Sequence, residues 1–145
     1  MGYIRFENIV KNFGSTQVLK NINLDIEKGQ LVTLLGPSGC GKSTLLRCLA
    51  GLETVTSGKI WLDGKEITNV EPRKRDIGMV FQQYSLFPNL MVEKNVAFGL
   101  QLKKMSKNQI DTKVKEMLEI VGLGDKGKNY PSQLSGGQQQ RAALA

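Results

Sequence analysis

Residues 36–44, which read GPSGCGKST, have the composition and spacing that binding of a phosphate group requires. They fit the pattern of Gly, four residues, Gly, Lys and then Ser or Thr. Lys42 adds a full positive charge, worth about 4 kcal/mol toward an anion at about 4 Å in a medium of dielectric constant near 20. With Ser43 as a ligand for Mg²⁺, the loop predicts a site for a nucleoside triphosphate. Three residues have no side chain, so that the backbone can direct successive N–H groups at phosphate oxygens: Gly36, Gly39 and Gly41.

The segments on both sides of this loop predict the order strand, loop, helix. The apolar run at residues 31–35 predicts a buried strand, and Leu45, Leu46 and Leu49 share one face of a predicted helix. A helix that begins at the loop adds partial positive charge from its N-terminus. The alternative, a glycine-rich turn with a solvated lysine, would not require this context.

Alternating apolar residues over positions 4–26 predict an antiparallel hairpin at the start of the chain. Its turn falls at residues 12–16, which places Phe13 at the tip. There the ring either stacks on a purine or packs beneath the loop, and the sequence leaves both roles open. A second hairpin is predicted at Asp63-Gly64, between two apolar runs.

A charged segment leads from the second hairpin to a further predicted strand. Residues 72–76 are expected to form a solvated surface loop. The apolar run at residues 77–81 predicts another buried strand, which ends at the polar pair Gln82-Gln83. Open α/β sheets bind ligands beyond the carboxyl ends of their strands, so Gln82 is a candidate site residue.

The composition becomes that of a helical region after residue 84, which predicts an α/β core at 1–84 and a helical subdomain at 85–145. Apolar residues recur at every fourth position from Val92. A capping box at Ser106 predicts a second helix, which ends at Gly122.

A final helix is predicted to begin after Ser135, which is a good N-cap residue. The two glycines that follow, Gly136 and Gly137, leave the first N–H groups open to a second anion. By itself this pattern is a weak signal, and a plain turn is the alternative.

The composition limits the class of protein. A chain of 145 residues with 40% hydrophobic residues suits a modest globular fold, and no apolar run is long enough to span a bilayer. Because two cysteines are too few for a secreted disulfide framework, a cytoplasmic protein is expected. The chain has no histidine, which excludes a histidine base, and the net charge of +7 is expected to solvate the surface rather than to bind nucleic acid.

These motifs in this order resemble the ATP-binding subunit of ATP-binding-cassette (ABC) transporters. Residues 134–138, LSGGQ, resemble the signature motif of that family, and residues 36–44 resemble its Walker A motif. Gln82 falls at the place of the Q-loop glutamine, and Phe13 at that of an aromatic residue, commonly Tyr, that stacks on adenine. The run MVFQQYSLFPNLMV at residues 79–92 looks most like the ATPases of bacterial importers for polyamines, ferric iron, sulfate, sugars or phosphonates.

The resemblance implies a P-loop NTPase core with a mixed α/β sheet, an α-helical subdomain, and a head-to-tail dimer that holds each ATP between two subunits. It assigns Mg²⁺ to Ser43 and Gln82, and docking on transmembrane permease subunits to the stretch between Tyr84 and Leu90. A solute-binding protein is an indirect partner, no nucleic acid is expected, and the chain is placed on the cytoplasmic face of the cell membrane. Contacts with ATP are assigned to these residues: Phe13, Gly36, Ser38, Gly39, Cys40, Gly41, Lys42, Ser43, Thr44, Gln82, Ser135, Gly136, Gly137 and Gln138.

The sequence departs from the family pattern after the signature motif, where the family has a Walker B strand, a catalytic Glu and a switch His. No catalytic residue is therefore assigned, and the chain alone is expected to be inactive, while its parent protein hydrolyses ATP. The open place in the sheet is expected to expose apolar side chains. Two alternatives remain, a non-catalytic nucleotide-binding module and an ABC-type DNA-repair or chromosome ATPase. The short gap between the two motifs argues against the second.

Overall fold

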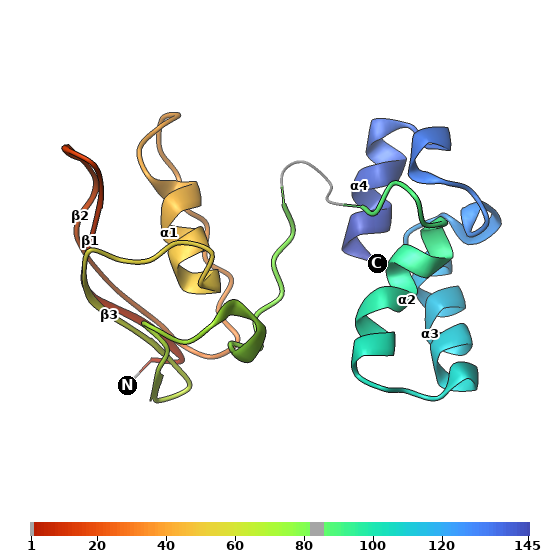
Figure 1. The fold of residues 1–145 in the computed structure, drawn as a ribbon, viewed down its shortest axis with the longest axis horizontal. Helices are drawn as coiled ribbons and strands as arrows, with labels where there is room; N and C mark the ends of the chain where they lie inside the picture. Colours follow the sequence, from red (N-terminus) through yellow and green to blue (C-terminus); the bar gives the residue numbers. More distant parts are fainter. Residues whose placement is uncertain (1, 82–85) are drawn as a thin grey trace. The chain divides into compact units, whose positions relative to one another are not determined.

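The computed structural model describes residues 2–81 and 86–145. The chain forms two compact units, Met1–Met79 and Val80–Ala145 (Figure 1). The boundary predicted between residues 84 and 85 falls outside the described residues. In the part of the chain that is described, no helix is both long and apolar enough to cross a bilayer.

The first unit is built on an antiparallel sheet with the strand order β2-β1-β3-β4. Both predicted hairpins are confirmed: Phe13 pairs with Thr16 across the first turn, and Asp63 and Gly64 form the second with φ of 48° and 73°. A 3₁₀ turn at Pro72–Lys74 follows the sheet. The strands and the helix have these bounds: β1 (Ile4–Phe13), β2 (Thr16–Ile26), α1 (Lys42–Ala50), β3 (Ser57–Leu62) and β4 (Lys65–Glu66).

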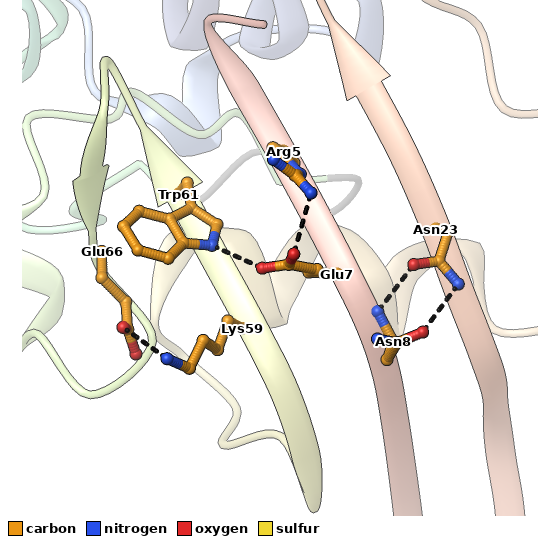
Figure 2. Close-up of polar contacts among 7 residues, drawn as sticks. All are labelled: Arg5, Glu7, Asn8, Asn23, Lys59, Trp61 and Glu66. Atoms are coloured by element: carbon orange, nitrogen blue, oxygen red, sulfur yellow. Dashed lines mark hydrogen bonds and ion pairs between the residues drawn. The ribbon is translucent and has the colours of Figure 1, made fainter. Parts of the chain in front are cut away.

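Strand β1 carries a bulge at Asn8, whose φ is 51° and where the register shifts against both neighbouring strands. The Asn8 backbone N–H donates to Asn23 Oδ1 at 2.9 Å, and Asn23 Nδ2 donates to Asn8 Oδ1 at 3.2 Å (Figure 2). On the other side, the Glu7 carboxylate accepts from Arg5 at 2.8 Å and from Trp61 Nε1 at 3.0 Å. Side chains therefore connect the three strands where the backbone ladder is interrupted.

The core of the first unit lies between the sheet and α1. Leu45 of α1 is buried as predicted, whereas Leu46 is 46% exposed and Cys48, at 1% exposed, takes its place. The buried cluster consists of Phe6, Ile9, Leu19, Leu45, Cys48, Ile60 and Ile67.

The buried strands predicted at residues 31–35 and 77–81 do not form, and both segments are irregular. Leu31 is 96% exposed and Leu35 is 88% exposed, while Leu34 and Ile77 still pack against the core. A strand must pair its backbone N–H and C=O groups with a neighbour, and among the described residues neither segment has a place in the sheet. Both apolar runs have the composition of a strand. Composition alone does not form a strand, because the backbone also needs a neighbouring strand with which to pair.

Arg75 contradicts the prediction that residues 72–76 are a solvated loop, because its side chain is only 4% exposed. The last carbonyl groups of a helix are unpaired and carry partial negative charge, so they accept a cation. Burial lowers the pKa of the Arg75 guanidinium from its ordinary value. Gly51 ends α1 with a φ of 78°, as predicted, and a Cβ there would lie 2.6 Å from Arg75 Nε. The guanidinium donates to four backbone carbonyl oxygens: Cys48 (2.7 Å), Leu49 (2.8 Å), Thr68 (3.0 Å) and Val70 (2.7 Å).

The second unit is helical. Ser106 begins α3 with the predicted capping box, in which its backbone N–H donates to Gln109 Oε1 at 3.1 Å. Gly122 follows the helix with a φ of 66°. The α-helices have these bounds: α2 (Val92–Leu102), α3 (Lys107–Ile120) and α4 (Gly136–Leu144). Short 3₁₀ turns lie at Gly124–Lys126 and Pro131–Gln133. The buried cluster of this unit consists of Val92, Ala97, Ile110, Val114, Leu118, Leu123, Leu134 and Ala142.

Candidate functional site

The glycines of the loop at residues 36–41 adopt conformations that other residues avoid. Gly36, Gly39 and Gly41 have φ of 152°, 81° and 97°. A Cβ at Gly36 would lie 2.8 Å from Cys40 Sγ, so this position also lacks space for a side chain. At Gly39 a Cβ would meet nothing within 4 Å, and the loop is therefore open to solvent at this point. The sequence requires glycine here for the backbone path itself.

Lys42 folds back over this loop. Its Nζ donates to the carbonyl oxygens of Gly36 and Pro37, both at 2.8 Å, and lies 3.3 Å from Cys40 Sγ. These acceptors are uncharged, and among the described residues no carboxylate forms an ion pair with Lys42. The loop therefore holds a full positive charge that an external anion can neutralise.

The N-terminus of α1 adds backbone N–H groups to this charge. The N-cap residue is Gly41, no side chain caps the helix, and the first turn contains no acidic residue. The first helical bond joins the Leu45 N–H to the Gly41 carbonyl at 2.9 Å, so the N–H groups of residues 42–44 precede it. A lysine and a helix N-terminus at one loop fit a phosphate chain. Ser43 lies exposed in the same turn, where its hydroxyl fits a phosphate-bound Mg²⁺.

Phe13 lies on the hairpin that supports this loop. A Cβ at Gly41 would be 2.9 Å from Leu19 Cδ2 and 3.2 Å from the Val18 carbonyl oxygen, which shows how closely the loop approaches β2. Leu19 pairs with Lys11, and Phe13 lies two residues further along β1. At about 3.4 Å per residue, the Phe13 Cα lies about 7 Å along the strand from the Cα of Lys11. Phe13 is 47% exposed, which favours stacking on a ligand over packing beneath the loop.

The second predicted anion site, at the start of α4, is more closed than expected. Ser135 Oγ accepts the Gln138 N–H at 3.4 Å, and the Ser135 N–H donates to Gln138 Oε1 at 2.8 Å. Ser135 is thus the predicted N-cap, but its side chain closes one N–H group of the first turn. Gly136 and Gly137 are exposed, and a Cβ at Gly137 would meet nothing within 4 Å.

The predicted site residues divide between the two units. The phosphate loop and Phe13 belong to the first unit, and residues 135–138 belong to the second. Gln82, predicted to bind Mg²⁺, lies outside the described residues, as does Tyr84.

Sequence reasoning missed Lys11, which is only 7% exposed. Strict alternation from Phe6 would direct Lys11 toward solvent. The bulge at Asn8 shifts the pattern by one residue, so that Ile9 and Lys11 turn inward. The available signal was Asn8 itself, a residue type that tolerates positive φ.

The sequence was compared with protein families and with curated proteins. A family model described as "ABC transporter" matches residues 19–145. The chain is 51% identical over 144 residues to the spermidine/putrescine import ATP-binding protein PotA of Thermotoga maritima, covering 99% of this chain and 39% of that protein. It is 55% identical over 142 residues to the sulfate/thiosulfate import ATP-binding protein CysA of Gloeobacter violaceus, covering 98% and 41%. It is 52% identical over 144 residues to the Fe(3+) ions import ATP-binding protein FbpC of Brucella abortus, covering 99% and 41%.

Two solved structures of an ABC transporter cassette are similar to this chain in fold. The dimeric structure of MJ0796, a bacterial ABC transporter cassette, superposes with a TM-score of 0.89 at 35% identity, over 97% of this chain and 67% of that one. A post-hydrolysis dimer of MJ0796 bound to ADP and Pi gives a TM-score of 0.88, also at 35% identity and over the same shares of both chains. The chain spans about two fifths of the length of the curated relatives named above.

Proposed function

Since this chain belongs to the ABC transporter family, we propose that it is the nucleotide-binding part of the ATPase subunit of a bacterial importer. The observation that carries the proposal is the phosphate loop, where Lys42 and the uncapped N-terminus of α1 present positive charge without an acidic neighbour. The relatives are named as import ATP-binding proteins, which favours an importer over a DNA-repair ATPase or a module that only binds nucleotide. They are named for three different solutes at 51–55% identity, so the proposal names no solute.

Each predicted site residue has a role in this proposal. Phe13 stacks on adenine, the loop amides and Lys42 hold the β- and γ-phosphates, and Ser43 with Gln82 holds Mg²⁺, which supplies positive charge to the phosphate oxygens. The remaining loop contacts with the phosphates come from Gly36, Ser38, Gly39, Cys40, Gly41 and Thr44. The residues of the signature motif that approach the ATP of a second subunit in a head-to-tail dimer are Ser135, Gly136, Gly137 and Gln138.

Docking on permease subunits is proposed for the stretch between Tyr84 and Leu90, and Asn95 supports it. Asn95 Oδ1 accepts the Phe87 N–H at 2.7 Å, and its Nδ2 donates to the carbonyls of Phe87 and Leu90 at 3.2 and 3.0 Å. The rings of Phe87 and Phe98, with centroids 4.7 Å apart, are 46% and 38% exposed. An exposed aromatic pair, beside backbone that Asn95 holds at Phe87 and Leu90, suits a partner helix. Such a complex would sit on the cytoplasmic face of the membrane with a solute-binding protein as indirect partner.

Calorimetric titration with MgATP tests the nucleotide site. The unchanged protein should bind saturably, and Lys42→Ala should weaken binding by up to about a thousandfold, because a charge worth about 4 kcal/mol is lost. Lys20→Ala is the matched control, because Lys20 is an exposed lysine on β2 and lies outside the phosphate-loop motif. Equal affinities in the unchanged protein and Lys42→Ala would show that the loop is not the site.

The transport role is tested with the full-length parent protein, assembled with its permease subunits in lipid vesicles. Phosphate release should require the permease subunits and should stop with Lys42→Ala. An assembled complex that releases no phosphate under any condition would contradict the importer assignment.

A further inference from the structure

A buried cation lies over the exposed ring of Phe13. Lys11 Nζ is 4.7 Å from the centroid of that ring, within the range of a cation–π contact. Lys11 is 7% exposed, whereas Phe13 is 47% exposed. The ring is therefore held by an interior group while much of its surface stays open to solvent.

Lys11 is fixed in turn by an acidic residue. Glu53 Oε2 lies 3.3 Å from Lys11 Nζ, and Glu53 Oε1 lies 3.7 Å from an Arg47 guanidinium nitrogen on α1. An ammonium group with so little exposure requires such a counter-charge, because an unpaired buried charge is costly. The carboxylate thus connects the strand that carries Phe13 with the helix that follows the phosphate loop.

The segment around Glu53 is also bound to β1 through its backbone. The Thr56 N–H donates to the Val10 carbonyl at 2.8 Å, and the Asn12 N–H donates to Thr56 Oγ1 at 2.9 Å. These bonds flank Lys11 on both sides in sequence. These bonds fix the backbone of β1 on both sides of Lys11, and the ion pair with Glu53 fixes the end of its side chain.

We propose that Lys11 is a positioning residue for the nucleobase, which holds the Phe13 ring from one side so that the opposite face receives the purine of ATP. An aromatic residue next to a turn would otherwise lose ring freedom when the base binds, and a ring that is already ordered avoids that cost. The ammonium group also draws the π electrons toward itself, which leaves the far face better suited to an electron-rich purine. The inference rests on the proposed function, because it takes ATP as the ligand of the adjacent loop.

The experiment compares two ligands that share phosphates and differ in the base. Calorimetry measures the affinity of the full protein for MgATP and for magnesium tripolyphosphate, first unchanged and then as Lys11→Met. Met keeps an unbranched apolar side chain, one atom shorter than that of Lys and without its charge, and Glu53 keeps Arg47 as an ionic partner. We expect Lys11→Met to weaken MgATP binding by about tenfold and tripolyphosphate binding by less than about twofold.

Two further variants separate positioning from folding. In a Phe13→Ala protein, Lys11→Met should have no additional effect on MgATP, because the ring through which it acts is absent. Glu53→Gln should weaken MgATP in the same base-dependent way, by a smaller factor. Lys20→Met, on the exposed side of β2, is the charge-matched control and should change neither affinity.

Three outcomes would overturn the inference. Equal losses for both ligands in Lys11→Met and Glu53→Gln would mean that Lys11 only stabilises the fold. An unchanged affinity for MgATP would mean that the ring does not need Lys11. If the unchanged protein bound neither ligand, the proposed function would fail first, and that result is visible before any substitution is made.

Discussion

The N-termini of α1 and α4 each lie in a glycine-containing motif, yet they are built in opposite ways. Helix α1 starts from Gly41 at a φ of 97°, with no capping side chain. Helix α4 starts from Ser135 at a φ of −65°, and Ser135 and Gln138 satisfy each other's backbone N–H groups. The first terminus depends on glycine for its shape and on Lys42 for its charge, whereas a side chain already caps one N–H group of the second.

A polar, glycine-rich helix start is therefore not in itself an anion site. At α1 the N–H groups of three residues remain for an external acceptor, which makes the loop the stronger candidate. At α4 the Gln138 N–H is already used, so a phosphate in the proposed dimer would meet Gly136 and Gly137 or displace the Ser135 hydroxyl.

Among substitutions that test the difference between the two helix starts, Gly41→Ala should have the largest effect on stability. The left-handed φ and a Cβ only 2.9 Å from Leu19 Cδ2 should together reduce the free energy of unfolding by about 3 kcal/mol. Gly39→Ala is the matched control, because its φ is 81° but a Cβ meets nothing within 4 Å, and about 1 kcal/mol is expected. Urea unfolding measures both, and equal losses would show that close packing on β2 does not fix the loop.

Alkylation of the two cysteines tests whether the open end of α1 is where the ligand binds. Cys40 is exposed in the loop, and Cys48 is buried near the other end of the helix. MgATP at ten times its dissociation constant should slow alkylation of Cys40 by about tenfold, because about nine tenths of the sites are then occupied. Mass spectrometry of the labelled peptides reads out both thiols. A Cys40 rate that is independent of nucleotide would contradict the placement.

Ser135→Ala tests whether the start of α4 depends on its capping box. Loss of the capping hydroxyl should lower the free energy of unfolding by about 1 kcal/mol and speed hydrogen exchange in the first turn of α4. Ser132→Ala, an exposed hydroxyl in the preceding 3₁₀ turn, is the control and should change little. If the two variants behave alike, α4 does not depend on its capping box.

The smallest predicted effect concerns the far end of α1. Burial raises the pKa of the Cys48 thiol, so the folded protein keeps this proton above the pH at which the unfolded chain loses it. The contribution of the protonated Cys48 thiol to the free energy of unfolding is fully present below about pH 8.5. It falls by at most about 1 kcal/mol between about pH 8.5 and 9.5. Urea unfolding over this range should show a shallower decline in Cys48→Ala than in Cys40→Ala. Identical slopes would contradict the burial of Cys48 in solution.

Much of the fold could be predicted because its signals are local. The turns at Phe13–Thr16 and Asp63-Gly64 and the caps at Ser106 and Ser135 each depend on a few adjacent residues, and all four are confirmed. The phosphate loop is local in the same sense, because its glycines and Lys42 lie within one short motif.

The remainder depends on residues that are distant in the chain. The runs at 31–35 and 77–81 have strand composition, but pairing requires a neighbour that they do not contain. Lys11 and Arg75 are charged residues that the sequence predicts to be exposed. Strand alternation predicts this for Lys11, and the charged segment at residues 72–76 predicts it for Arg75. A bulge at Asn8 turns Lys11 inward, and the Cys48 and Leu49 carbonyls at the end of α1 hold Arg75 inward.

The four hydrogen bonds that the Arg75 guanidinium donates have a consequence for which residues the sequence can exchange. All four acceptors are backbone carbonyls, which every residue type provides, so a substitution at those positions does not remove the acceptor. Only the guanidinium and the bare Cα of Gly51 are specified, since a Cβ would lie 2.6 Å from Arg75 Nε. Glycine is therefore required at position 51 for two separate reasons: its φ of 78° is left-handed, and a Cβ there would meet Arg75. Loss of the arginine would remove the second restriction and leave the first.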